Sequence, residues 1–214
     1  MIRRTCFSRV VSATSAIVAT VVLGTTSVAF PALSGDRDAW AEISTAFDKM
    51  RALPGYRVRQ MIARGSTIVN SATFEVVPPD SAHITGQMSP TIILEVIAVG
   101  KETRDRVIDH GVSTPWRCNA IKTPSLLPGP DSSQVDITVS RGRDTIIEGT
   151  RVRAYSYSYI SSAPDHRIRG REDVWIGMRT RLLRRLRTTT ESATLTQDFY
   201  DYGARIAIIL PACG

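Results

Sequence analysis

After Pro54 the chain consists of short runs in which apolar and polar residues alternate, separated by turn signals. In the first run Val58 and Ile62 fall on one face of an extended strand, and Arg57 and Arg59 fall on the other. Runs of this kind, rich in β-branched residues and bounded by Pro, Gly and Asp, recur almost to the C-terminus. About ten or eleven short strands at hairpin spacing predict one curved antiparallel sheet, shaped as a half-open barrel.

The predicted strands follow one another without a repeat or a low-complexity segment, so we expect a single domain over 34–214. Three prolines make 119–133 a long connection instead of a strand. The runs cover, in chain order, 56–63, 67–77, 82–87, 91–99, two short strands between 100 and 116, 135–140, 145–148, 151–160, 168–176, 182–189, 193–202 and 205–210.

One helix precedes the strands. Trp40, Ile43, Phe47 and Met50 recur at steps of three and four, which is the spacing of one helical face. Ser34 or Asp36 can cap its start, and Pro54–Gly55 ends it. Core packing accounts for the apolar stripe, and a helix that covers the open side of a barrel would show the same stripe. The predicted class is therefore α+β, mainly β, with the sheet covered by this helix and by a loop or helix lid.

The N-terminus has the three parts of a secretory signal. Arg3, Arg4 and Arg9 precede an uncharged stretch that extends to position 30, and small residues follow it. We expect residues 1–29 to be removed after Ala29, with Ala32 as the second choice; an uncleaved membrane anchor is the alternative. In both cases the domain lies in the periplasm or otherwise outside the cytoplasm. Cys6 precedes the apolar stretch, so it is not the lipid-bearing cysteine of a lipoprotein signal.

The positive charge is spread along the chain. Without the signal, 24 basic residues face 20 acidic ones, a net charge of +4. The densest basic cluster contains no aromatic residue on which a base could stack, which argues against nucleic-acid binding. A solvated edge or contact with an anionic membrane surface or an acidic partner accounts for this cluster. Its members are Arg179, Arg181, Arg184, Arg185 and Arg187.

Two cysteines remain in the exported domain, Cys118 and Cys213. Paired cysteines are the simplest outcome outside the cytoplasm, and two free thiols are the alternative. A disulfide would close a loop of roughly 94 residues and stabilise the fold by ~2–4 kcal/mol.

No catalytic motif is present, so we predict that the protein is not an enzyme. The three histidines, His83, His110 and His166, have no second ligand at metal spacing. No nucleophile elbow and no phosphate-binding Gly-rich loop occurs. We therefore expect neither a metal nor a cofactor.

A strand with tyrosines on one face and small side chains on the other suggests a cavity. Tyr155, Tyr157 and Tyr159 share one face of a strand, and mostly small residues share the other. Small side chains leave volume that a neighbouring element or a ligand must fill. From aromatic and large apolar side chains we select as candidate cavity lining Trp40, Phe47, Met50, Phe74, Val76, Leu94, Val96, Trp116, Tyr157 and Trp175.

The order of several motifs resembles the LolA-like superfamily, which comprises periplasmic lipoprotein carriers and their lipoprotein relatives. The likeness extends over nearly the whole exported chain. It implies a half-open antiparallel barrel whose concave apolar face is lidded by helices and takes up acyl chains, with 119–133 where relatives often place a lid. The motifs are Leu53-Pro54-Gly55-Tyr56-Arg57-Val58, Val76-Val77-Pro78-Pro79-Asp80-Ser81-Ala82-His83, Glu95-Val96-Ile97-Ala98-Val99-Gly100, Gly149-Thr150-Arg151-Val152-Arg153-Ala154-Tyr155, Asp173-Val174-Trp175-Ile176-Gly177 and Asp198-Phe199-Tyr200-Asp201-Tyr202-Gly203.

The residues and the resemblance together predict an exported monomer that binds or carries lipid or lipidated protein without catalysis. Burial of acyl chains needs only a curved sheet with an apolar face, because each buried methylene contributes about 0.8 kcal/mol. The alternative is a periplasmic sensor or regulatory domain that binds a membrane signalling protein such as an anti-sigma factor, as some relatives of this fold do.

Overall fold

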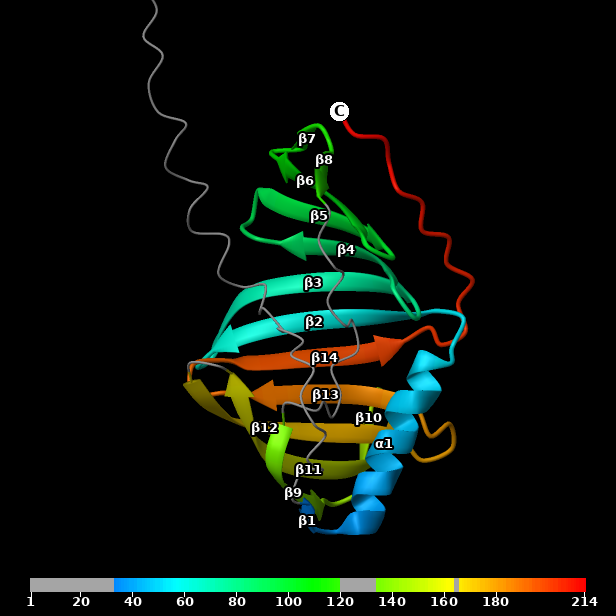
Figure 1. The fold of residues 1–214 in the computed structure, drawn as a ribbon, viewed down its shortest axis with the longest axis vertical. Helices are drawn as coiled ribbons and strands as arrows, with labels where there is room; N and C mark the ends of the chain where they lie inside the picture. Colours follow the sequence, from blue (N-terminus) through cyan, green and yellow to red (C-terminus); the bar gives the residue numbers. More distant parts are fainter. Residues whose placement is uncertain (1–32, 120–133, 164–165) are drawn as a thin grey trace, which may run out of the picture.

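The computed structural model describes residues 33–119, 134–163 and 166–214. It consists of helix α1 (Arg37–Arg51) and a 14-stranded sheet (Figure 1). The predicted signal peptide, 1–29, and nearly all of the predicted lid segment, 119–133, fall outside the described residues. In the described parts no helix is long and apolar enough to span a bilayer.

The sheet is a curved meander with one rearranged edge. From one edge to the other its order is β1-β9-β11-β12-β13-β14-β2-β3-β4-β5-β6-β7, with β10 paired to β11 and β8 paired to β6. The strands are β1 (Leu33–Gly35), β2 (Tyr56–Arg64), β3 (Thr67–Val77), β4 (Ser81–Gln87), β5 (Ile92–Val99), β6 (Glu102–Asp109), β7 (Val112–Ser113), β8 (Arg117–Asn119), β9 (Gln134–Arg141), β10 (Thr145–Ile147), β11 (Thr150–Ala163), β12 (His166–Gly177), β13 (Leu183–Thr189) and β14 (Thr194–Tyr200).

The predicted sheet is confirmed, with two differences. The structure adds short strands at the edges, and one of them, β1, pairs in parallel with β9, so the sheet is not entirely antiparallel. The predicted last strand, 205–210, is not a strand. Its residues alternate between exposed and half-buried as a strand would, but among the described residues no backbone hydrogen bonds join 205–213 to a neighbour. Alternation indicates extended backbone and does not supply a pairing partner.

Helix α1 begins and ends close to the predicted positions. The Asp36 carboxylate caps it by accepting a hydrogen bond from the Ala39 backbone N–H at 2.9 Å. Ile43, Phe47 and Met50 are buried, as their helical spacing predicts, whereas Trp40 of the predicted stripe is only half-buried and Ala39 is buried beside it.

Cross-strand register divides the sheet into two faces. The inner face packs against α1 and carries, for example, Tyr155 of β11, opposite Val174 of β12, which is opposite Leu186 of β13. The outer face carries the residues between them, such as Trp175 and Arg185. Because side chains alternate along a strand, successive strand residues lie on opposite faces, and the register then assigns each described strand residue to the inner or the outer face.

Candidate functional site

Helix α1 covers only half of the inner face. It contacts β9, β12 and β13, and the hydrophobic core around it draws on β2 and β3 but on no residue of β4, β5 or β6. In Figure 1 the helix lies over the strands at the β9–β13 end, and β3–β6 lie in the other half of the sheet. Among the described residues, no helix covers the inner face of β3–β6.

The uncovered half is apolar along continuous rows. Ala72, Gly86, Leu94 and Val107 face one another across β3, β4, β5 and β6. A second row joins residues of β3, β4 and β5 and lies one pleat away. We call this surface the open inner face; it consists of Ala72, Phe74, Ile84, Gly86, Ile92, Leu94, Val96 and Val107.

In the part of the chain that the structure describes, the open inner face is only loosely covered by neighbouring side chains. All of its residues except Gly86 are only half-buried. A Cβ atom built on Gly86 would meet nothing closer than the Ala72 Cβ at 3.8 Å. Beneath α1, by contrast, Phe47, Met50 and Tyr157 are at most 1% exposed, so that half is a packed core. Among the described residues, the inner face over β3–β6 is therefore less densely packed than the half beneath α1.

A polar group ends one of these rows at the sheet edge. Asp105 of β6 is opposite Val96 of β5 on the inner face and is 8% exposed. Its carboxylate accepts hydrogen bonds from the side chains of Arg117 and Asn119 on β8. The charge of Asp105 is therefore balanced by Arg117, so this end of the open inner face is polar without an uncompensated buried charge.

The outer face of the same strands is charged. Arg57 donates to Glu75 at 2.8 and 2.9 Å, and His83 contacts Glu95 at 2.8 Å. Arg106 donates to Glu95 at 2.6 Å. The Arg57 guanidinium lowers the pKa of Glu75, so this carboxylate stays ionised. The outer face of β2–β6 thus carries a network of charged side chains beside apolar residues such as Ile97.

The candidate lining residues from the sequence fall into three groups. Trp40, Phe47, Met50, Val76 and Tyr157 belong to or pack against the core beneath α1, where the Trp40 and Tyr157 ring centroids lie 5.4 Å apart. Leu94 and Val96 lie on the open inner face, and so does Phe74, which also packs against that core.

Trp116 and Trp175 lie on the outer side of the sheet. The guanidinium of Arg106 stacks over Trp116 at 4.4 Å from the ring centroid, and that of Arg187 lies over Trp175 at 5.3 Å. Trp175 is opposite Ala154 and Arg185, which are outer-face residues. Aromatic character alone did not reveal the face, because an outer indole can be covered by a cation instead of a ligand.

Sequence reasoning did not select Ala72, Ile84, Gly86, Ile92 and Val107. Alternation in 82–87 and the apolar run in 91–99 contained the signal, but it could be used only once one residue of each strand was assigned to a face.

In the described residues, no group of three or more His, Cys, Asp or Glu side chains is arranged to hold a metal ion.

The predicted pairing of Cys118 with Cys213 is present, with the two Cα atoms 5.8 Å apart. The bond ties the extended C-terminal segment to β8, and the Gly214 backbone N–H donates to the Trp116 carbonyl at 3.2 Å. At its other end the segment is held by the Gly203 N–H, which donates to the Gly55 carbonyl at 2.8 Å.

Comparison with known proteins finds likeness only at the level of structure. No protein-family model matches the sequence, and no curated protein matches it. The lipoprotein LppX of Mycobacterium tuberculosis is 14% identical, with 82% of this chain and 100% of LppX aligned at a TM-score of 0.57. LprF of Mycobacterium bovis is also 14% identical, with 84% of this chain and 99% of LprF aligned at a TM-score of 0.53. Identity this low shows the fold alone, which is a curved, half-open sheet with a helix packed against it.

Proposed function

We propose that the protein is exported and binds the acyl chains of a lipid or a lipidated protein on the open inner face. The observation that carries this proposal is the division of one inner face into two halves. One half is packed beneath α1, and the other presents half-buried apolar side chains that no described helix covers. A partly exposed apolar surface of this kind supports a binding site for an apolar ligand.

The energetics favour chains over compact ligands. Rows of apolar side chains cross β3–β6 and offer contact along a length instead of a closed pocket. Each methylene removed from water contributes about 0.8 kcal/mol, so about eight methylenes give ~6 kcal/mol before the cost of association. Binding of acyl chains in this way requires no reactive side chain, in keeping with a binding or carrier role outside the cytoplasm.

Two substitutions on one strand test the proposal. Leu94→Gln places an amide on the open inner face, and Ile97→Gln makes the same kind of change on the outer face of β5, where Ile97 is also half-buried. The measurement is titration of the purified protein with a fatty acid that carries a fluorescent anthroyloxy group. We expect L94Q to weaken binding by at least about fivefold, because it interrupts the apolar rows, and I97Q to change it by less than about twofold.

Absence of binding by the unmodified protein, or equal losses in the two variants, would contradict the proposal. Lipid mass spectrometry of the protein purified from its native host then identifies the natural chains. If that preparation holds no lipid and instead retains a membrane signalling protein, the regulatory alternative replaces the carrier function.

A further inference from the structure

Two glutamines lie on the inner face where its packed half meets the open inner face. Gln197 of β14 is opposite Leu186 of the core on one side and Gln60 of β2 on the other. Gln60 is in turn opposite Ala72, the first residue of an apolar row of the open inner face. Strands β14 and β2 are neighbours near the middle of the sheet (Figure 1). The row that starts at Ala72 therefore has a pair of amides at its end nearest the packed half.

The amide of Gln197 is buried, and only one of its two polar atoms is satisfied. Its Nε2 donates to the Oε1 of Gln60 at 3.1 Å. Gln197 is 6% exposed, and among the described residues its Oε1 has no hydrogen-bond partner. Gln60 is half-buried, and its own Nε2 donates to no group of the described chain. The pair thus leaves one acceptor on Gln197 and one donor on Gln60 unused.

The position of Gln197 distinguishes it from the other buried polar atoms that lack a partner in the described chain, which are Tyr56 Oη, Arg104 Nε and Arg153 Nε. Tyr56 is opposite the buried Val76, and its row contains no residue of the open inner face. The two arginines use their other guanidinium nitrogens, Arg104 for Glu102 and Arg153 for Glu42. Of these four atoms, only the Gln197 acceptor lies in a row that crosses the open inner face. A buried acceptor without a partner is costly, so its position there points to a ligand.

The polar group at the far edge of the open inner face is already satisfied. The Oδ1 atom of Asp105 accepts a hydrogen bond from Asn119, and its Oδ2 atom accepts from Arg117. A ligand that extends across β3–β6 therefore finds a missing hydrogen-bond partner at the glutamine end and not at the Asp105 end.

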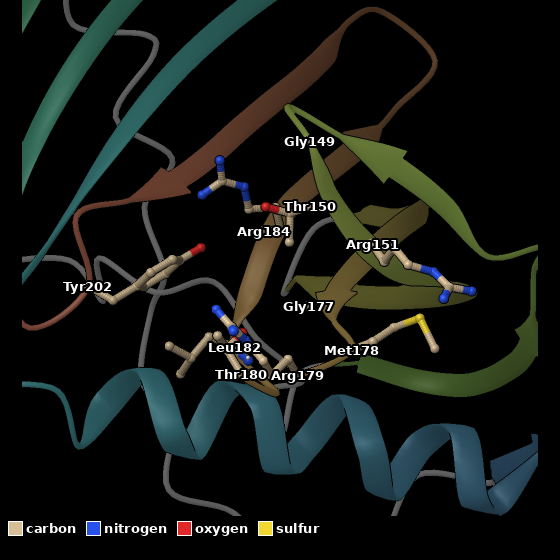
Figure 2. Close-up of a pocket in the computed structure, with 10 residues that line it drawn as sticks. All are labelled: Gly149, Thr150, Arg151, Gly177, Met178, Arg179, Thr180, Leu182, Arg184 and Tyr202. Atoms are coloured by element: carbon tan, nitrogen blue, oxygen red, sulfur yellow. Dashed lines mark hydrogen bonds between the residues drawn. The ribbon is translucent and has the colours of Figure 1, made fainter.

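The residues that line the concave pocket in Figure 2 offer no comparable group. This pocket has a volume of about 390 Å³ and lies between the turn that joins β10 to β11, the turn that joins β12 to β13, and Tyr202. Arg151 and Arg179 are exposed, and the Arg151 guanidinium lies beside Met178, directed away from Arg179. The Tyr202 hydroxyl already contacts two main-chain carbonyls. The pocket therefore does not bring polar groups together on one ligand.

We propose that the Gln60–Gln197 pair binds a secondary amide at the head of the acyl chain. The inference rests on the proposed acyl-chain function and names the linkage that the site prefers. An amide N–H donates to the Gln197 Oε1 atom while the amide carbonyl accepts from the Gln60 Nε2 atom. An ester has a carbonyl but no N–H, so it leaves the buried Gln197 acceptor unpaired.

The apolar row beyond the glutamines has room for a chain of ordinary length. From Ala72 to Val107 it crosses three inter-strand spacings, which amount to about 14 Å. This is close to the length of an extended dodecanoyl chain. With its amide at Gln60 and Gln197, such a chain covers the row as far as β6.

Two ligands that differ only in the linkage test the proposal: N-methyldodecanamide and methyl dodecanoate. Each displaces the fluorescent fatty acid from the protein, and the measured quantity is the dissociation constant of the ester divided by that of the amide. The common chain contributes equally to both constants, so the ratio reports the linkage. We expect this ratio to be at least about fivefold larger in the unmodified protein than in Gln197→Leu, which removes the acceptor. Gln60→Leu should lower the ratio in the same direction.

Gln87→Leu is the matched control. Gln87 of β4 follows Gly86 of the inner face, so it lies on the outer face, where it is exposed. Its substitution should leave the ratio within about twofold of the unmodified protein. Urea denaturation first shows that each variant folds, and Gln60→Leu, at a half-buried position, provides the test if Gln197→Leu does not fold.

The same ratio in the unmodified protein and in the variants of Gln60 and Gln197 would overturn the amide assignment. Displacement of the fatty acid by methyl dodecanoate would in that case still support acyl-chain binding. If neither ligand displaces the fatty acid, the acyl-chain function itself is contradicted, and the amide assignment is lost with it.

Discussion

The Glu42 carboxylate of α1 accepts a hydrogen bond from the Tyr155 hydroxyl of β11 at 2.6 Å, so the helix and the sheet meet through a buried tyrosine and a half-buried acid. Arg153 and Arg181 contact the same carboxylate at 3.0 and 2.7 Å. Burial alone would raise the pKa of Glu42, but the hydrogen bonds from Tyr155 and Arg153 and the two positive charges outweigh it and lower this pKa. One carboxylate therefore joins α1 to β11 and to the turn between β12 and β13.

Glu42→Gln should lower the free energy of unfolding by ~1–2 kcal/mol, because it removes the charge that two arginines share and leaves Arg153 poorly compensated. Urea denaturation measures the loss. Asp48→Asn is the control on the same helix, since Asp48 forms only an exposed pair with Arg51 at 2.7 Å and should cost less than ~0.5 kcal/mol. Equal effects of the two substitutions would mean that Glu42 does not fix the helix on the sheet.

Stability should decrease as the pH falls below about 4.5. The pKa values of Glu42, Glu75 and Glu95 are all lowered from the ordinary 4.5, Glu75 chiefly by the hydrogen bond from Arg57. For Glu95, burial opposes the lowering, and Arg106 and His83 outweigh it. Below pH 4.5 the unfolded chain binds more protons than the folded one, so the contribution of these groups is present above that pH and is lost through their folded pKa values.

Urea denaturation between pH 3 and pH 6 measures this dependence. The slope of unfolding free energy against pH should be positive below pH 4.5 and smaller in Glu42→Gln, which lacks one of the three groups. A variant with the same slope as the unmodified protein would show that Glu42 titrates alike in both states.

The sequence predicted the sheet and the helix because both have strong periodic signals. The stripe of Ile43, Phe47 and Met50 requires a partner surface, and the structure provides it on β9–β13. The edges were less predictable, since β1 is only three residues long and pairs with the distant β9, whereas the equally short β10 was predicted and pairs with the adjacent β11. The segment 205–210 looked like a strand because its residues alternate, although its backbone pairs with nothing in the described parts.

The candidate site was only partly predictable because alternation does not say which face turns inward. Leu94 and Val96 lie on the open inner face, whereas Trp175 lies on the outer face, one residue after the buried Val174. A shift of one residue in register moves a side chain to the other face. The bulge between Trp175 and Ile176 further changes which residues of β12 and β13 are opposite each other. The pairing of Arg153 and Arg181 with Glu42 could not be predicted, because it is a tertiary contact.

Removal of the disulfide should destabilise the fold and release the C-terminal segment. Cys118→Ser/Cys213→Ser opens a loop between positions 95 apart in sequence, and a loss of ~2–4 kcal/mol in unfolding free energy is expected. Residues 205–213 make no backbone hydrogen bonds to the rest of the described chain, so they depend on their two attached ends.

Hydrogen exchange separates these two effects. Amides near the Gly214–Trp116 contact should exchange faster in the double variant, and those of β2 and β14 should keep the order of their protection. The matched control is Ser34→Ala, which removes an exposed hydroxyl that hydrogen-bonds Thr138 on the far edge of the sheet. Unchanged exchange at the C-terminal end would show that contacts other than the disulfide hold the segment.

Two glycines on the inner face should respond differently to the same added methyl group. Gly170 of β12 is buried opposite Tyr159, and a Cβ atom there would lie 2.6 Å from the Tyr159 hydroxyl oxygen. Gly170→Ala should therefore displace the ring and lower the unfolding free energy by ~1–3 kcal/mol. Gly86 of β4 has its nearest atom at 3.8 Å, so Gly86→Ala should change stability by less than ~1 kcal/mol, because alanine fits an unstrained strand with free space above it. Thermal and urea denaturation of the pair measure the contrast, and an equally large loss at Gly86 would mean that the inner face over β3–β5 is filled and has no room for an acyl chain.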